Sequence, residues 1–122
     1  MANLKTNNLS GEGGRNAISG SVQFNGGNDA LAIPASSDFA YGTGDFTIEA
    51  WIWKNGNPVT GQTRGIYTQT QSGNDYIVFK VGSTNNIQVT FGSTTISTTE
   101  KIAVLSWNHV AVSRSSNTVK VF

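Results

Sequence analysis

The clearest alternation of apolar and polar residues in this chain lies between residues 44 and 53. The apolar positions are Phe46, Ile48, Ala50 and Ile52. The positions between them are Thr47, Glu49, Trp51 and Trp53. Successive side chains of a β-strand point to opposite faces of a sheet, so a period of two predicts a strand. We expect this strand to be central, with one face in the core and two indole rings on the other.

Shorter segments with the same alternation follow one another closely along the chain. The predicted strands are residues 21–24, 30–33, 44–53, 65–69, 75–81, 87–91, 94–97, 107–114 and 118–122. Residues 25–29 are rich in Asn and Gly and predict a tight turn that joins the first two strands as a hairpin, which ends at Pro34. Residues 101–105 are compatible with one turn of helix, and no segment predicts an amphipathic helix. Roughly nine short strands at this spacing predict an all-β fold, an antiparallel β-sandwich or jelly roll.

The first 20 residues lack such a pattern. They are rich in Asn, Ser and Gly, and their few apolar residues share no period. We predict an extended arm over residues 1–20 that orders against a neighbouring subunit, followed by one domain over residues 21–122; an unstructured terminus is the alternative. The expected assembly contacts of the arm are Leu4, Lys5, Leu9, Arg15 and Ile18.

Length and composition narrow the class of protein. A chain of 122 residues is long enough for one domain with a modest core. A formal net charge of +1 and a charged fraction of 12% provide no basic stripe, so we expect no nucleic-acid partner. The absence of cysteine excludes disulfides and thiolate-bound metals. No apolar segment has the length of a membrane span or the form of a secretory signal, so we expect no membrane partner and synthesis in the cytoplasm.

Four sequence blocks carry a resemblance to a known family. They are residues 21–26 (SVQFNG), 29–34 (DALAIP), 44–52 (GDFTIEAWI) and 107–112 (WNHVAV). In order and spacing they resemble the signature blocks of laminin G-like domains of the concanavalin A-like lectin/glucanase superfamily. The resemblance implies a jelly roll of two antiparallel sheets with ligand loops at one rim. It also implies further strands after residue 122, so we expect either a fragment of a longer protein or an edge that a neighbouring chain covers.

Catalytic groups are sparse. Glucanase relatives carry two or three carboxylates at alternating positions of one strand, where their spacing sets up glycoside chemistry. Glu49 is alone on its strand, and Asp45 at the start of that strand is expected to serve a turn. His109, the only histidine, is interpreted as a half-buried, hydrogen-bonded structural residue. We therefore expect no enzyme activity.

Calcium is the one cofactor that the sequence leaves open. Hard oxygen ligands are available at Asn28, Asp29, Asp38 and Asp45. The same residue types are common in turns because their side chains hydrogen-bond to nearby backbone. We therefore predict no resident cofactor and assign no ligand set.

Sugar binding has better candidates, because aromatic rings stack on a pyranose while amide and hydroxyl groups hydrogen-bond its rim. The long polar connection over residues 54–64 is the expected ligand loop. The predicted ligand-binding residues are Trp53, Asn55, Asn57, Arg64 and Tyr67. Tyr76 and Trp51 are further aromatic candidates, although the resemblance implies that Trp51 belongs to the fold.

Two functional classes remain after these exclusions. One is a structural interaction module that the N-terminal arm fastens to a larger assembly, and the other is a carbohydrate-binding adhesion module. A polar arm leading into such a domain, without a signal or cysteine, resembles virion proteins of tailed bacteriophages: capsid decorations or tail and fibre components. This resemblance implies a virion location, with other virion proteins or copies of the chain as partners. In the second class the partner is a glycan.

Overall fold

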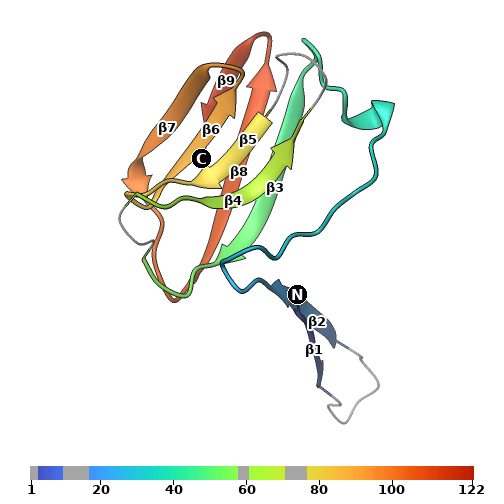
Figure 1. Ribbon diagram of the computed structural model, residues 1–122, viewed down its shortest axis with the longest axis vertical. Coiled ribbons are helices and arrows are strands. Elements are labelled where there is room, and N and C mark those ends of the chain that lie inside the picture. The colour runs from blue at the N-terminus through green and yellow to red at the C-terminus, as the bar shows by residue number, and fades with distance from the viewer. Residues whose placement is uncertain (1–2, 10–16, 58–60, 71–76) are drawn as a thin grey trace. The chain divides into compact units, whose positions relative to one another are not determined.

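The computed structural model describes residues 3–9, 17–57, 61–70 and 77–122, and it describes side chains from residue 20 onward within those ranges. The chain divides into two compact units, Met1–Ala35 and Ser36–Phe122. Figure 1 shows the strands of each unit. The predicted boundary between residues 20 and 21 stays a prediction.

The first unit is built on a pair of strands. β1 (Asn3–Leu9) and β2 (Ala17–Gln23) pair antiparallel over seven residues each. The described part of the predicted arm is therefore mostly paired strand. The predicted hairpin between residues 21–24 and 30–33 is wrong, because residues 21–23 belong to β2 and pair with β1, whereas residues 30–33 form no strand.

The turn that this hairpin required does form at residues 25–29. Gly26 has a φ of 76°, a conformation that glycine adopts without a Cβ clash. The Asn25 side chain accepts a hydrogen bond from Gly27 N at 2.7 Å, and Asp29 Oδ2 accepts one from Asn25 N at 3.0 Å. The chain therefore turns here as predicted, but the segment after the turn leaves Leu31 and Ile33 exposed and unpaired with any described strand.

The second unit is an antiparallel β-sandwich. Its elements are η1 (Ser37–Phe39), β3 (Phe46–Trp53), β4 (Arg64–Gln69), β5 (Ile77–Val81), β6 (Asn86–Phe91), β7 (Thr94–Lys101), β8 (Trp107–Ser115) and β9 (Thr118–Val121). One sheet has the order β3-β8-β9, and the other has the order β4-β5-β6-β7 (Figure 1). The predicted all-β sandwich is confirmed. The short η1 is the only helical element that the structure describes, and no helix in the described residues could span a membrane.

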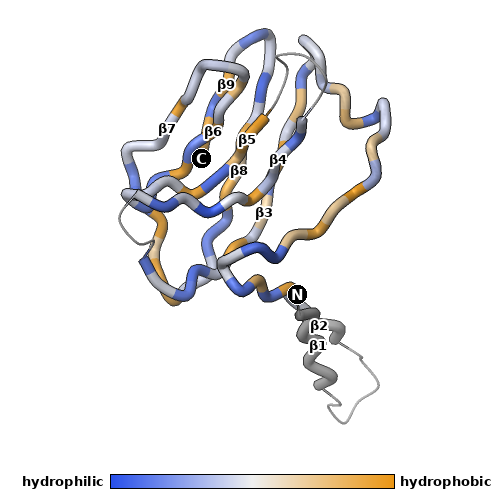
Figure 2. Tube along the Cα trace, in the orientation of Figure 1, coloured by the Kyte–Doolittle hydropathy of each residue, from blue (hydrophilic) through white to orange (hydrophobic). Residues whose placement is uncertain are grey.

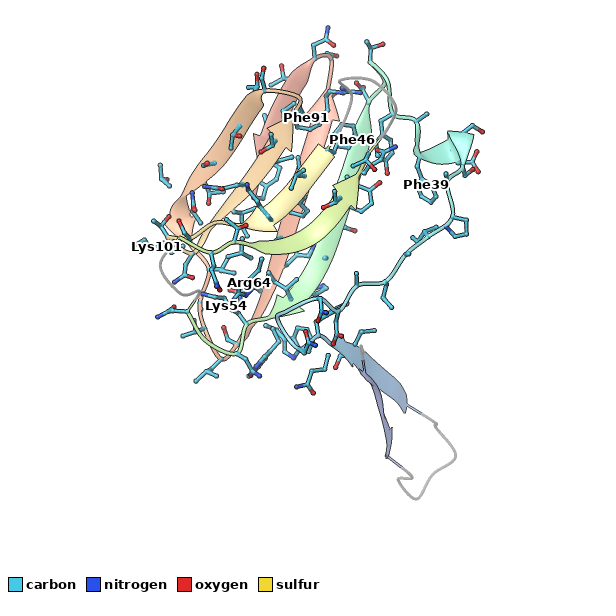
Figure 3. The ribbon with its side chains drawn as sticks, viewed as in Figure 1. Phe39, Phe46, Lys54, Arg64, Phe91 and Lys101 are labelled. Atoms are coloured by element: carbon cyan, nitrogen blue, oxygen red, sulfur yellow. The ribbon has the colours of Figure 1, made fainter. Side chains whose placement is uncertain are left out.

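The core lies between these two sheets and draws on both. Its buried members are Phe46, Ile77, Phe79, Val81, Ile87, Val89, Val110 and Val112. Figure 2 shows apolar positions alternating with polar ones along the strands, and Figure 3 shows Phe46 and Phe91 lying between the sheets. The alternation predicted for β3 is confirmed, because Phe46 is buried, its three apolar companions are half-buried and the four intervening side chains are exposed. Tyr41 stacks on Phe46 with ring centroids 5.0 Å apart.

The connection before β8 differs from the prediction. Residues 101–105 form no helical turn, because β7 continues to Lys101 opposite Asn86. The Asn108 side chain then holds the following loop: its Oδ1 accepts from Ala103 N, and its Nδ2 donates to Ala103 O, each at 3.0 Å. One amide side chain thus supplies hydrogen bonds that a helical turn would have made internally. Residues 75 and 76, predicted as part of β5, lie outside the described residues.

Candidate functional site

Three tryptophans gather on the outer surface of the β3-β8-β9 sheet. Trp51 lies opposite His109, and Trp53 lies opposite Trp107, where β3 pairs with β8. Directly opposed residues of an antiparallel pair point to the same side of the sheet. Because the core-facing positions of β3 are even-numbered, all four of these side chains point outward.

Phe122 extends this surface beyond β9. Its backbone N donates to Ala111 O at 2.9 Å, and Ala111 N donates to Phe122 O at 3.0 Å. Ala111 in turn lies opposite Glu49 on β3, so the Phe122 ring is on the outer side as well. We call the set Glu49, Trp51, Trp53, Trp107, His109 and Phe122 the aromatic face. Trp51 is 67% exposed and Phe122 is 61% exposed, which is unusual for rings of this size.

The rings of the aromatic face contact one another and a polar pair. Trp53 and Trp107 meet edge to face with centroids 5.8 Å apart, and the Trp51 and His109 rings lie 5.1 Å apart. His109 Nε2 is 3.1 Å from Glu49 Oε2. The face therefore offers large apolar rings together with an exposed donor and acceptor, a combination suited to binding an amphipathic ligand.

A second cluster lies in the loops that follow β3 and β5. Lys54 comes directly after Trp53, and its carbonyl accepts from Leu105 N at 2.8 Å. Its Nζ donates to Asn57 Oδ1 at 3.4 Å and also to Asn85 Oδ1. Asn85 Nδ2 donates to Asn57 Oδ1 at 2.8 Å, and Asn85 has a φ of 69°, which places it in a left-handed turn that Asn tolerates. We call Lys54, Asn57, Asn85 and Arg64 the lysine cluster.

Charge in the lysine cluster is all positive. Burial lowers the pKa of Lys54, and the nearby positive charge of Arg64 lowers it further. Figure 3 shows Lys54 and Arg64 at the same end of the sandwich. No carboxylate among the described residues forms an ion pair with Lys54. The site would therefore be stabilised by a negative charge.

The predicted ligand-binding residues separate into two groups. Trp53 lies on the aromatic face, while Asn57 and Arg64 lie in the lysine cluster, and Asn55 is exposed in the same loop. Tyr67 is in neither place: it packs against the core, and its hydroxyl oxygen lies 3.5 Å from that of Tyr41. Burial, followed by the contact with Tyr41, raises the pKa of Tyr67 to about 12, so the phenol stays neutral near pH 7. That the five predicted residues bind a ligand together stays a prediction.

Trp51 lies on the outward side of β3, as the alternation predicts, and most of its ring is exposed; the role in the fold that the resemblance implies stays a prediction. The interpretation of His109 is corrected. His109 was expected to be half-buried, yet its side chain is exposed, although the expected hydrogen bond exists with Glu49. In both cases the strand parity was the correct signal, since odd-numbered positions of β3 and the paired positions of β8 point outward.

Seven residues of these two sites are not among the predicted ligand-binding residues. They are Glu49, Trp51, Lys54, Asn85, Trp107, His109 and Phe122. The alternation of residues 107–112 would have placed Trp107 and His109 on one side, and pairing with β3 would then have identified the face. Nothing in the local sequence links Lys54 to Asn85, which is 31 residues away.

The predicted assembly residues lie in the first unit. Leu4, Lys5 and Leu9 are on β1, and Ile18 is on β2. Arg15 lies outside the described residues. Their contacts with another chain stay a prediction.

The residues considered for calcium serve local turns where they are described. Asp38 accepts from Ser36 Oγ at 3.1 Å at the start of η1, and Asp45 Oδ1 accepts from Ser116 N at 3.0 Å. Within the described residues, no group of three or more His, Asp or Glu side chains is placed to hold a metal ion.

Comparison with protein families gives one match. The model that matches residues 25–122 describes the concanavalin A-like lectin/glucanase superfamily, as a laminin G-like domain. Comparison with curated proteins and with solved structures found no significant match.

Proposed function

Because this chain belongs to the concanavalin A-like lectin/glucanase superfamily, we propose that it is a non-catalytic carbohydrate-binding module whose contact surface is the aromatic face. The observation that carries the proposal is that all three tryptophans of the chain lie exposed on one side of one sheet. Large exposed aromatic groups gathered on one surface mark interaction sites, since leaving them in water is unfavourable.

The chemistry of the face favours a sugar over a purely apolar ligand. A pyranose has an apolar side that stacks on a ring and hydroxyls at its rim that need hydrogen-bond partners. Trp51 and Trp53 supply rings two residues apart on β3, a spacing of about 7 Å along a strand. Glu49 Oε2 and His109 Nε2 pair with each other at 3.1 Å, and each side chain has a second polar atom that can meet a sugar hydroxyl. We infer that an extended glycan lies along β3 and β8 across the rings.

Each tryptophan ring should contribute separately to polysaccharide binding. Trp53→Ala and Trp107→Ala are each expected to weaken polysaccharide binding by about tenfold or more, because truncating a Trp in an interface commonly costs over 1 kcal/mol. A glycan array would identify the ligand, and isothermal titration calorimetry would measure its affinity for each variant.

Phe24→Ala is a matched control, because Phe24 is an aromatic residue in the first unit with the same 47% exposure as Trp53. It should leave the affinity unchanged. Circular dichroism would verify that each variant is folded. Flat responses across the array, or Trp variants that bind as tightly as the parent protein, would contradict the proposal.

We also propose that the protein is a component of a bacteriophage virion, a capsid decoration or a tail or fibre protein, attached through its first unit. The separation of Met1–Ala35 as its own compact unit supports such an attachment role. Amine-reactive cross-linking of intact virions should join Lys5 on β1 to a different protein chain. Lys120 on β9 is the comparison site in the sandwich. Cross-links from Lys5 to its own chain alone, or absence of the protein from purified virions, would contradict this role.

A further inference from the structure

Lys54 is the one charged or polar residue that is buried in the part of the chain the structure describes, with 9% of its surface exposed. Taking an ammonium group out of water costs several kcal/mol unless partners compensate it. Its described partners are the side-chain oxygens of Asn57 and Asn85, which carry only partial charge. The positive charge of Lys54 is therefore hydrogen-bonded but not neutralised by any described residue.

Donors in the lysine cluster outnumber the acceptors that they contact. An ammonium has three N–H donors, and two of those on Lys54 meet the Asn57 and Asn85 oxygens. Arg64 uses Nη1 for Gln62 Oε1 at 3.1 Å and for Thr63 O at 3.2 Å. Its Nε and Nη2 make no hydrogen bond to another described residue. The guanidinium fork suits an oxyanion, because two parallel N–H groups match two oxygens.

Two like charges placed together are unfavourable without an anion. The Arg64 charge acts on Lys54 in the same direction as burial, since both disfavour the charged ammonium. A bound anion would offset both effects, because its negative charge favours the charged ammonium. The amides also hold Lys54 in place, because Asn85 Nδ2 donates to Asn57 Oδ1 at 2.8 Å and so fixes the two oxygens that face the ammonium.

We propose that Lys54 and Arg64 bind an oxyanion, the carboxylate of a sugar acid, with Asn57 and Asn85 orienting the ammonium. The inference rests on the proposed function and names its substrate class as an acidic polysaccharide. The two sites are adjacent along the chain, because Lys54 directly follows Trp53 and its carbonyl is bonded to the loop that leads into Trp107. Successive side chains point to opposite sides, so Lys54 points away from the aromatic face, and a glycan that crosses the Trp53–Trp107 pair would have to continue around this end of the sandwich to bring an acidic group to Lys54.

Three ligands test the anion site and separate a free anion from a polymer as its source. Glucuronate alone probes the anion site, and a polyuronate compared with a neutral glucan probes the polymer. Titration by NMR should shift the Asn57 and Asn85 side-chain amide signals as glucuronate is added. Lys54→Met should weaken glucuronate binding by about tenfold or more, as expected for loss of a charge-assisted hydrogen bond. The variant should fold, because Asn57 is exposed and its Oδ1 still accepts a hydrogen bond from Asn85 Nδ2 at 2.8 Å after the ammonium is removed.

Arg64→Gln is a second variant, useful if Lys54→Met proves unstable, and it should also weaken glucuronate binding. Lys120→Met removes a positive charge from the exposed side of β9 and should leave glucuronate binding unchanged. Equal glucuronate affinity in the parent protein and in both cluster variants would overturn the proposal, as would the absence of amide shifts at high glucuronate. The protein could instead bind free glucuronate or inorganic sulfate but bind polyuronate no more tightly than neutral glucan. That result would overturn the claim that the anion belongs to an acidic polysaccharide.

Failure of this inference differs from failure of the proposed function. Trp53→Ala should lose the polysaccharide but keep glucuronate, because it leaves both cations in place. Lys54→Met should lose glucuronate and the preference for polyuronate, but keep residual binding to neutral glucan through the rings.

Discussion

Replacing Phe79 with alanine is expected to lower the free energy of unfolding by about 3–5 kcal/mol, the range for removing a buried phenyl ring. Phe79 has 0% exposure and lies at the centre of the β4-β5-β6-β7 sheet, between Tyr67 on β4 and Val89 on β6. Its loss removes apolar burial and leaves a cavity that packed sheets fill only partly. Domains are typically stable by about 5–15 kcal/mol, so the variant would keep little of its stability.

Phe122→Ala makes the same chemical change at the surface and is the control. The Phe122 ring is mostly exposed on the aromatic face, so its truncation should change stability by less than about 0.5 kcal/mol. Urea unfolding followed by circular dichroism would give the midpoint and slope for both variants. A Phe79→Ala midpoint close to that of Phe122→Ala would show that the sandwich core is not where the structure has it.

The positions of the strands in the sandwich could be predicted from the sequence, because each strand has one buried side. β3 and β6 alternate cleanly, and both have the buried faces that their apolar residues predict. The alternation also predicted on which side of β3 the Trp51 side chain lies. Parity alone puts this residue opposite the core, as the structure has it.

The pairing of strands was harder to predict from the sequence, because the alternation of side chains does not show which strands hydrogen-bond to each other. Residues 30–33 have strand-like alternation and follow a real turn at Gly26, yet β2 takes β1 as its partner. The lysine cluster shows the same limit at a larger distance. Asn85 meets Lys54 because the turns after β3 and β5 converge, and this follows from the sandwich topology and not from either loop's sequence.

The segment before β3 is fastened to the sandwich by one side chain from β8. Arg114 Nε donates to Gly44 O at 2.8 Å, and Nη2 donates to Gly42 O at 2.7 Å and to Tyr41 O at 3.2 Å. The guanidinium also lies over the Phe46 ring, 4.9 Å from its centroid. Gly42, with a φ of 47°, lets the backbone turn several carbonyls toward one cation. Within the described ranges no acidic side chain pairs with Arg114, so its charge is held by backbone carbonyls and an aromatic ring.

Arg114→Met should therefore cost about 2 kcal/mol of unfolding free energy, more than an exposed ion pair contributes, because it leaves several carbonyls without their charged donor. Arg114→Lys should recover only part of the loss, since an ammonium cannot reach the carbonyls as a planar fork does. Chemical denaturation measures both, and faster amide hydrogen exchange at Gly44 would locate the effect in this segment. Lys120→Met removes a cation from the neighbouring strand as the control and should be nearly neutral. If Arg114→Met unfolds at the same denaturant concentration as Lys120→Met, the carbonyl contacts do not stabilise the fold, and Tyr41 is held by its stacking on Phe46 and its contact with Tyr67.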